Sequence, residues 1–197
     1  MSQIRPAIVS DLPGVYRVCL LTGDSGKDAT AIYRDPDLLG HLYVGPYLVG
    51  QPDFAFVVVD PAGVAGYTLA VPDTRAFEEW AEREWWPPLR KQHALADEAS
   101  PDADLIRTIH DPPVASHALL AEYPAHLHID LLPRLQGKGY GRRLIELMID
   151  RLCERGCTGV HLGVGVDNDR AIAFYEHLGF HPITREPGEL VMGVKLT

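Results

Sequence analysis

The chain has little cysteine, no long apolar run and a deficit of basic residues. Its 197 residues include three cysteines, Cys19, Cys153 and Cys157, which do not suggest a disulfide framework. No apolar run approaches the length of a membrane-spanning helix, and the N-terminus lacks a signal-peptide pattern. Lys and Arg number 18 against 27 Asp and Glu, which argues against nucleic acid or a membrane as partner. We expect a cytoplasmic protein whose net charge of −9 favours a cationic substrate such as an amine.

The order of predicted elements indicates an α/β (α+β) fold in one domain, residues 1–197. Apolar and β-branched runs predict strands at 4–7, 55–59, 64–71, 126–132, 158–166, 181–184 and 190–196. Caps and apolar stripes predict helices from Asp11, over 36–43, after Gly139 and over 168–178, and Gly45-Pro46-Tyr47 is expected to break the second of these. The long connection 72–124 is rich in tryptophan, and we expect helices there at 74–83, 85–95, 102–109 and 115–121.

The most informative stretch is Gln136-Gly137-Lys138-Gly139-Tyr140-Gly141-Arg142-Arg143, between an apolar strand and a long amphipathic helix. Its three glycines let the backbone turn tightly, so that several amide N–H groups point into one space. The first turn of the helix adds its own unpaired amides and the positive end of its dipole. With the charge of Lys138 and Arg142, this loop predicts a cradle for a phosphate or pyrophosphate.

Two common phosphate motifs do not fit the loop. A nucleotide P-loop requires Ser or Thr after its lysine, and none is present. A dinucleotide-binding fingerprint requires a different glycine spacing near the first strand of its unit. The spacing that does match is Gln/Arg-x-x-Gly-x-Gly/Ala, through Gln136, Gly139 and Gly141. It resembles the acetyl-coenzyme A pyrophosphate loop of the GCN5-related N-acetyltransferases, the GNAT family.

A second motif supports the same resemblance. The segment from Asn168 to Phe180 is similar to the family's Asn-x-x-Ala-x-x-Phe-Tyr-x-x-x-Gly-Phe block. Asn168 is a good N-cap, Phe174 and Tyr175 fall on one helical stripe, and Gly179 is suited to end the helix. The resemblance implies a GNAT fold, in which a mixed sheet is splayed between its two middle parallel strands.

A closer resemblance extends over nearly the whole chain. The order Gly23-Asp24-Ser25-Gly26, Gly66-Tyr67, Trp85-Trp86-Pro87-Pro88 and residues 123–130 is similar to the acetyltransferase-like C-terminal domain of O-GlcNAc hydrolases. No hydrolase domain is recognisable here, so the chain resembles a free-standing bacterial relative. The resemblance implies transfer of an acetyl group from acetyl-CoA, without a metal, to a primary amine: a small amine, a protein N-terminus or a lysine.

The resemblance also implies a coenzyme site. The main chain of Ile129, Leu131 and Leu132 would bind pantetheine along the strand edge, and Asn168 would bind its other side. The pyrophosphate would lie on Gln136, Gly137, Lys138, Gly139, Tyr140, Gly141 and Arg142. Tyr175 occupies the family position of the general acid, contacts the coenzyme, and as a phenol is protonated at neutral pH. The alternative role for Tyr175 is simple packing.

The catalytic base is less defined by the motifs. Strand 126–132 alternates, so His126, His128 and Asp130 share one face, which is expected to border a cleft. Asp130 is the first candidate for base or amine anchor, and His128 is the second because imidazole titrates near neutral pH. Alternatively, these two side chains bond each other as a structural pair. Asp24 and Asp73 are further candidates for binding a cationic acceptor.

Two other classes of function stay open. His126-x-His128-x-Asp130 has the alternation of the metal-binding strand motif of metallo-β-lactamases, although the glycine loop would then be unexplained. A non-catalytic module that binds acetyl-CoA or a protein partner is the other alternative. We expect a monomer or a homodimer.

Overall fold

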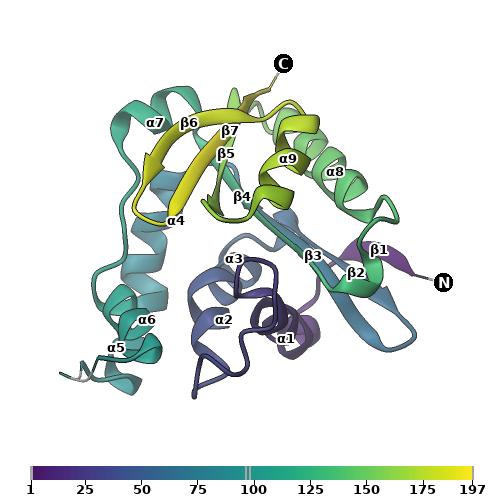
Figure 1. Ribbon diagram of the computed structural model, residues 1–197. Coiled ribbons are helices and arrows are strands. Elements are labelled where there is room, and N and C mark those ends of the chain that lie inside the picture. The colour runs from purple at the N-terminus through teal and green to yellow at the C-terminus, as the bar shows by residue number, and fades with distance from the viewer. Residues whose placement is uncertain (1, 96, 98, 197) are drawn as a thin grey trace.

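The computed structural model describes residues 2–95, 97 and 99–196. One seven-stranded mixed sheet runs through it in the order β1-β2-β3-β4-β5-β7-β6 (Figure 1). The strands are β1 Gln3–Pro6, β2 Ala55–Asp60, β3 Gly63–Val71, β4 Ala125–Leu131, β5 Gly159–Gly165, β6 His181–Glu186 and β7 Glu189–Lys195. All neighbouring strands are antiparallel except β4 and β5, so the predicted mixed sheet is confirmed.

The two parallel strands separate soon after they meet. In the described part of the chain, β4 and β5 pair at Ala125 with Val160 and at His126 with His161, and the later residues of β4 have no partner on β5. The other edge of β4 pairs with β3 over six residues, from Val71–His126 to Gly66–Leu131. The splay predicted from the family resemblance is therefore present, and it leaves the edge of β4 open from Leu127 onward.

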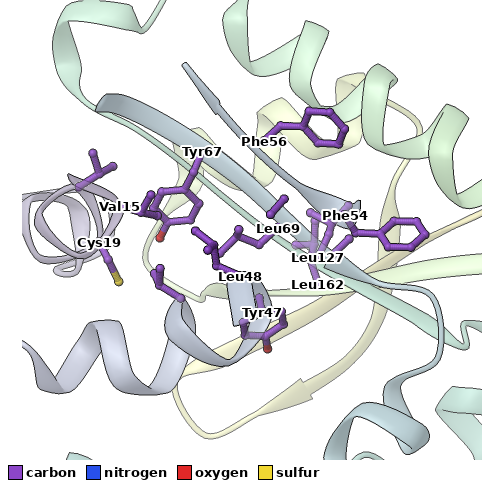
Figure 2. Close-up of a cluster of buried hydrophobic side chains, with 14 of the residues drawn as sticks. Val15, Cys19, Tyr47, Leu48, Phe54, Phe56, Tyr67, Leu69, Leu127 and Leu162 are labelled. Atoms are coloured by element: carbon purple, nitrogen blue, oxygen red, sulfur yellow. The ribbon is translucent and has the colours of Figure 1, made fainter. Parts of the chain in front are cut away.

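Helices cover both faces of the sheet. On one face lie α1 Leu12–Thr22, α2 Leu38–Tyr43 and α3 Gly45–Gly50, and on the opposite face lie α8 Tyr140–Glu154 and α9 Asp169–His177 (Figure 1). The core between these layers includes Val15, Tyr67 and Leu69 on the α1 side (Figure 2), and Leu144, Ile145 and Met148 of α8, all fully buried. No helix of the described residues is long and apolar enough to cross a membrane.

The expected break after Tyr43 is confirmed, because α2 ends there, and Gly45-Pro46-Tyr47 begin a separate helix, α3. Pro46 lies in its first turn, where its missing N–H costs no helical hydrogen bond. Close packing also requires glycine at position 45: a Cβ there would lie 2.4 Å from the Tyr16 hydroxyl and 2.5 Å from the Trp85 ring. Val44, with φ of −132° and ψ of −58°, leaves the helical region between α2 and α3, and α3 then places Tyr47 within hydrogen-bond distance of His126 and His128.

The insertion forms a helical wall beside β7 and β6 (Figure 1). It contains α4 Thr74–Trp80, a π-helical turn Ala81–Trp85, α5 Trp86–Gln92, α6 Pro101–His110 and α7 His117–Glu122. The two helices predicted before residue 95 are therefore joined by the π turn instead of a loop. Trp86 is 7% exposed and belongs to the main hydrophobic core, and the partly buried Trp80 and Trp85 pack against that core.

Candidate active site

The glycine loop is a set of free amides at the start of α8. Gly137 and Gly139 have φ of +70° and +79°, and nothing lies within 4 Å of a Cβ built on either one. The first bond of the helix joins Arg143 N to Gly139 O at 3.2 Å, so the amides before it have no acceptor within the helix. This open, positive helix end has the properties of a phosphate-binding cradle. Gly141 differs, because a Cβ there would lie 3.0 Å from Phe174 Cζ.

Two predicted coenzyme residues are held by bonds within the protein. Gln136 Nε2 donates to Leu131 O at 2.9 Å, and Arg170 donates to Gln136 Oε1 at 2.8 Å, so this side chain ties β4, the loop and α9 together. Asn168 Oδ1 accepts from Ala171 N at 3.1 Å and caps α9, which leaves its amide nitrogen as the available donor. The loop residues Ser25 and Gly26 approach Gly165 and Asn168, at the open end of β5.

Asp130 lies on the α1 side of β4, directly opposite Tyr67 of β3. Tyr67 Oη donates to Asp130 Oδ2 at 2.5 Å, and Tyr67 is fully buried beside Val15 and Cys19 of α1 (Figure 2). Burial raises the pKa of Asp130 to about 6, while the hydrogen bonds from Tyr67 and Thr22 act in the opposite direction. This carboxyl group therefore titrates close to neutral pH, as a general base requires.

Tyr175 is 8% exposed on α9, and its surroundings keep it protonated. Burial first, and then the negative charge of Asp130, raise the pKa of Tyr175 well above its ordinary value. In the described part of the chain its hydroxyl has no hydrogen-bond partner. A phenol that stays protonated at neutral pH has the property that a general acid requires.

A cavity of about 1080 Å³ opens on the α2–α3 face of the sheet. Its walls come from α2 and α3, the insertion helix α4, strands β4 and β5, and the β6–β7 hairpin. Five carboxylates line it against two guanidinium groups; they are Glu78, Glu79, Glu82, Glu186 and Glu189, against Arg75 and Arg83. Burial and the neighbouring Glu186 raise the pKa of Glu189, whose carboxylate lies over Gly163 of β5. The cavity therefore favours a positively charged occupant.

Histidine side chains form the inner wall of this cavity. His126 and His128 both place Nε2 at 2.9 Å from the hydroxyl of Tyr47, and His161 Nδ1 lies 2.9 Å from Tyr123 O. Burial lowers the pKa of His128 to about 4, with His161 adding to the effect. His128 is therefore neutral at pH 7 and a weaker base than Asp130.

One alternative for these side chains needs correction. His128 and Asp130 do not bond each other, because His128 bonds Tyr47 and Asp130 bonds Tyr67. No group of three or more His, Cys, Asp or Glu among the described residues is arranged to hold a metal ion.

Asp24 and Asp73 lie away from the cavity. Asp73 Oδ1 accepts from Ala76 N at 3.0 Å and caps α4, beside a smaller hollow of about 430 Å³. Asp24 is exposed and exchanges two backbone hydrogen bonds with Lys27, next to the loop that approaches Asn168. Of these predicted site residues, His128 lines the cavity, whereas Asp24 and Asp73 do not.

Comparison with known proteins gives the family. Residues 56–180 match the Acetyltransferase (GNAT) family. The chain belongs to this family of N-acetyltransferases. Over its full length this GNAT chain superimposes on a crystal structure named SsHAT, with a TM-score of 0.92, 36% identity and 98% of that chain covered.

Other relatives match different shares of this chain. The rat protein O-GlcNAcase is 25% identical over 189 residues, 94% of this chain, and the chain spans about a fifth of that protein's length. The Escherichia coli [ribosomal protein bS18]-alanine N-acetyltransferase is 46% identical over 52 residues, 26% of this chain and 35% of that protein. A crystal structure of this E. coli enzyme shares the fold, with a TM-score of 0.54 and 18% sequence identity. The superposition covers the whole of this chain and 95% of the chain of that enzyme.

Proposed function

We propose that this GNAT chain moves the acetyl group of acetyl-CoA to a cationic primary amine. One juxtaposition supports the proposal most. Strand β4 leads through a short helical turn into the cradle at Gly137–Gly141, and the same strand carries Asp130 and His128, of which His128 lines the acidic cavity. The donor would approach from one end of the open β4 edge and the amine from the other. The acetyl-CoA complex of the family member yncA from Salmonella typhimurium shares the fold, with a TM-score of 0.56 and 18% identity.

The donor would be held mostly by main-chain groups. The unpaired amides at 137–142 and the positive end of α8 would bind the pyrophosphate. The open edge of β4 at Ile129, Leu131 and Leu132 would bind pantetheine, with the free amide nitrogen of Asn168 on the other side. Lys138 and Arg142 would add charge attraction.

In the transfer step, the amine nitrogen bonds to the thioester carbon and the carbon–sulfur bond breaks. Asp130 would take the proton that the ammonium group must lose, directly or through a water molecule. Tyr175 would give its proton to the leaving thiolate. The nitrogen loses a second proton as it becomes the amide, and this proton would restore the Tyr175 phenol, so that the one proton released overall is the one taken up by Asp130. A carboxyl pKa of about 6 and a phenol held protonated by burial suit these two roles at neutral pH.

The decisive experiment combines binding and turnover on one preparation. Calorimetry with acetyl-CoA tests the cradle, and a screen of small amines, lysine peptides and peptide N-termini, read as free thiol release, tests transfer. Binding with no acceptor-dependent thiol release would favour the non-catalytic module. The cytoplasmic location, the absence of nucleic-acid and membrane partners, the monomeric or homodimeric state and the single domain over 1–197 stay predictions.

A further inference from the structure

The cavity histidines belong to a continuous chain of hydrogen bonds that begins at Thr74. Thr74 Oγ1 donates its one proton to Pro124 O at 2.8 Å, because a carbonyl oxygen only accepts. The same hydroxyl oxygen lies 2.8 Å from His126 Nδ1 and must therefore accept from it. His126 thus carries its proton on Nδ1. It is neutral, because its pKa lies well below its ordinary value.

The second half of the chain fixes His128 in the same way. A neutral His126 with its proton on Nδ1 has a lone pair on Nε2, so Tyr47 donates to it at 2.9 Å. That uses the only proton of the Tyr47 hydroxyl, whose oxygen then accepts from His128 Nε2–H at 2.9 Å. His128 carries its proton on Nε2, and its Nδ1 is left as a lone pair with no partner in the described part of the chain.

His161 presents the same kind of group to the same cavity. Its Nδ1 donates to Tyr123 O at 2.9 Å, so the lone pair of the neutral ring is on Nε2. The wall at His126, His128 and His161 therefore offers a ligand no imidazole N–H donor. The lone pairs of His128 Nδ1 and His161 Nε2 are left as acceptors, whereas His126 Nε2 already accepts from Tyr47. Together with the carboxylates that line the cavity, such a wall is selective for a ligand that donates hydrogen bonds.

We propose that His128 is a specificity-determining residue whose Nδ1 accepts a hydrogen bond from an N–H group of the cationic acceptor, and that Tyr47, His126 and Thr74 are positioning residues that fix this tautomer. The inference rests on the proposed function for the identity of the acceptor. Asp130 stands two residues further on the same face of β4, about 7 Å along the strand. His128 therefore holds the amine within reach of the base.

The tautomer is testable in the free protein, without coenzyme or turnover. Long-range ¹H–¹⁵N spectra of ¹⁵N-histidine-labelled protein at pH 7 are expected to show His128 protonated on Nε2 and His126 on Nδ1. Tyr47→Phe removes the bridging hydroxyl, and the His128 spectrum is expected to become a mixture of both tautomers. A wild-type His128 protonated on Nδ1, or an unchanged spectrum in Tyr47→Phe, overturns the positioning role even if the protein proves to be an active transferase.

Two substitutions at position 128 test the ligand contact. Asn places its side-chain oxygen near the position of Nδ1, whereas Gln reaches the position of Nε2. With L-lysinamide as the probe amine, His128→Gln is expected to raise KM about tenfold with kcat little changed, the effect of one hydrogen bond to a charged donor. His128→Asn is expected to restore most of the affinity. Equal KM values in the two variants, or no saturable shift of wild-type His128 Nδ1 on adding L-lysinamide, overturn the contact.

Discussion

The hydroxyl of Tyr67 donates a 2.5 Å hydrogen bond to the carboxylate of Asp130 across the β3–β4 pair. Two opposing effects therefore act on one carboxyl group. Burial favours the neutral acid, whereas the tyrosine bond favours the carboxylate, and the balance leaves the pKa at about 6. The sheet register thus places beside the opening between β4 and β5 a carboxyl group whose pKa suits the proposed role of base.

Asp130→Asn is expected to reduce the rate of transfer about 10²–10⁴-fold at pH 7.5, because it removes the base and keeps the size of the side chain. In the parent protein, kcat/KM is expected to rise with pH and level off above about 6, as Asp130 ionises. The measurement is acceptor-dependent thiol release from pH 5 to 8.5. If the Asn variant shows the same rise of kcat/KM between pH 5 and 7, the acid limb of the pH profile, then Asp130 is not the group whose ionisation causes that rise.

The stability of the same variant separates catalysis from structure. The folded-state pKa of Asp130 lies above its ordinary value of 3.8, so the folded protein holds this proton more tightly than the unfolded chain. The contribution of Asp130 to stability is therefore present in full below pH 4 and is lost as pH rises through 6. At pH 8 the melting temperature of the Asp130→Asn variant is therefore expected to equal or exceed that of the parent protein. A large loss there would indicate a structural carboxylate.

Tyr67→Phe tests the link between the two residues. Without the hydroxyl, the hydrogen bond that lowers the pKa of Asp130 is absent, so the acid limb of kcat/KM is expected to move upward by about one to two pH units. Relative to the parent protein, Tyr67→Phe is therefore expected to be less impaired at pH 8.5 than at pH 6.5. A rate reduced equally at every pH would instead show that Tyr67 only positions the strand.

Tyr175→Phe keeps the ring and removes the phenolic proton. Turnover is expected to fall about 10²–10⁴-fold while the affinity for acetyl-CoA stays close to that of the parent, because the packing of α9 is retained. An acceptor assay and calorimetry on the same sample give both values. A fully active variant would mean that Tyr175 only packs against the core.

The sequence predicted the parts of the molecule that local chemistry determines. The glycines at 137 and 139 are required by their left-handed backbone, and Gly179, with φ of +90°, ends α9 as expected. The alternation of His126, His128 and Asp130 also survives in β4, because a strand with one apolar face has little freedom to shift its register.

What the sequence did not reveal depends on pairing between distant segments. Tyr67 meets Asp130 only through the register of β3 with β4, and Tyr47 meets the histidines only because a new helix, α3, begins at Gly45. Asp73 was predicted as a substrate ligand from its charge, but the start of α4 uses its side chain as a cap. Charge and spacing alone do not distinguish a cap from a ligand.

Gly139→Asp is expected to abolish measurable acetyl-CoA binding, because it places a negative charge where the phosphates would lie. Gly156, at the other end of α8, provides a matched control: its φ is +80° against +79°, and neither site has an atom within 4 Å of a built Cβ. Gly156→Asp therefore carries a similar backbone strain outside the cradle. Calorimetry and melting curves of the pair are expected to show similar losses of stability and a loss of binding only at position 139. Equal binding by both variants would refute the cradle.

Glu189→Gln tests whether the rim of the cavity selects a cationic acceptor. Glu189 lies over Gly163 on the cavity wall, and it has no ion-pair partner within the described residues, so its charge is available to a ligand. The KM for a lysine-containing acceptor is expected to rise about three- to tenfold, and the increase is expected to shrink at high salt. Asp150→Asn on the exposed side of α8 makes the same change in net charge away from the cavity and is expected to leave KM unaltered. If both variants raise KM equally, the overall charge of the protein, and not the cavity, attracts the amine.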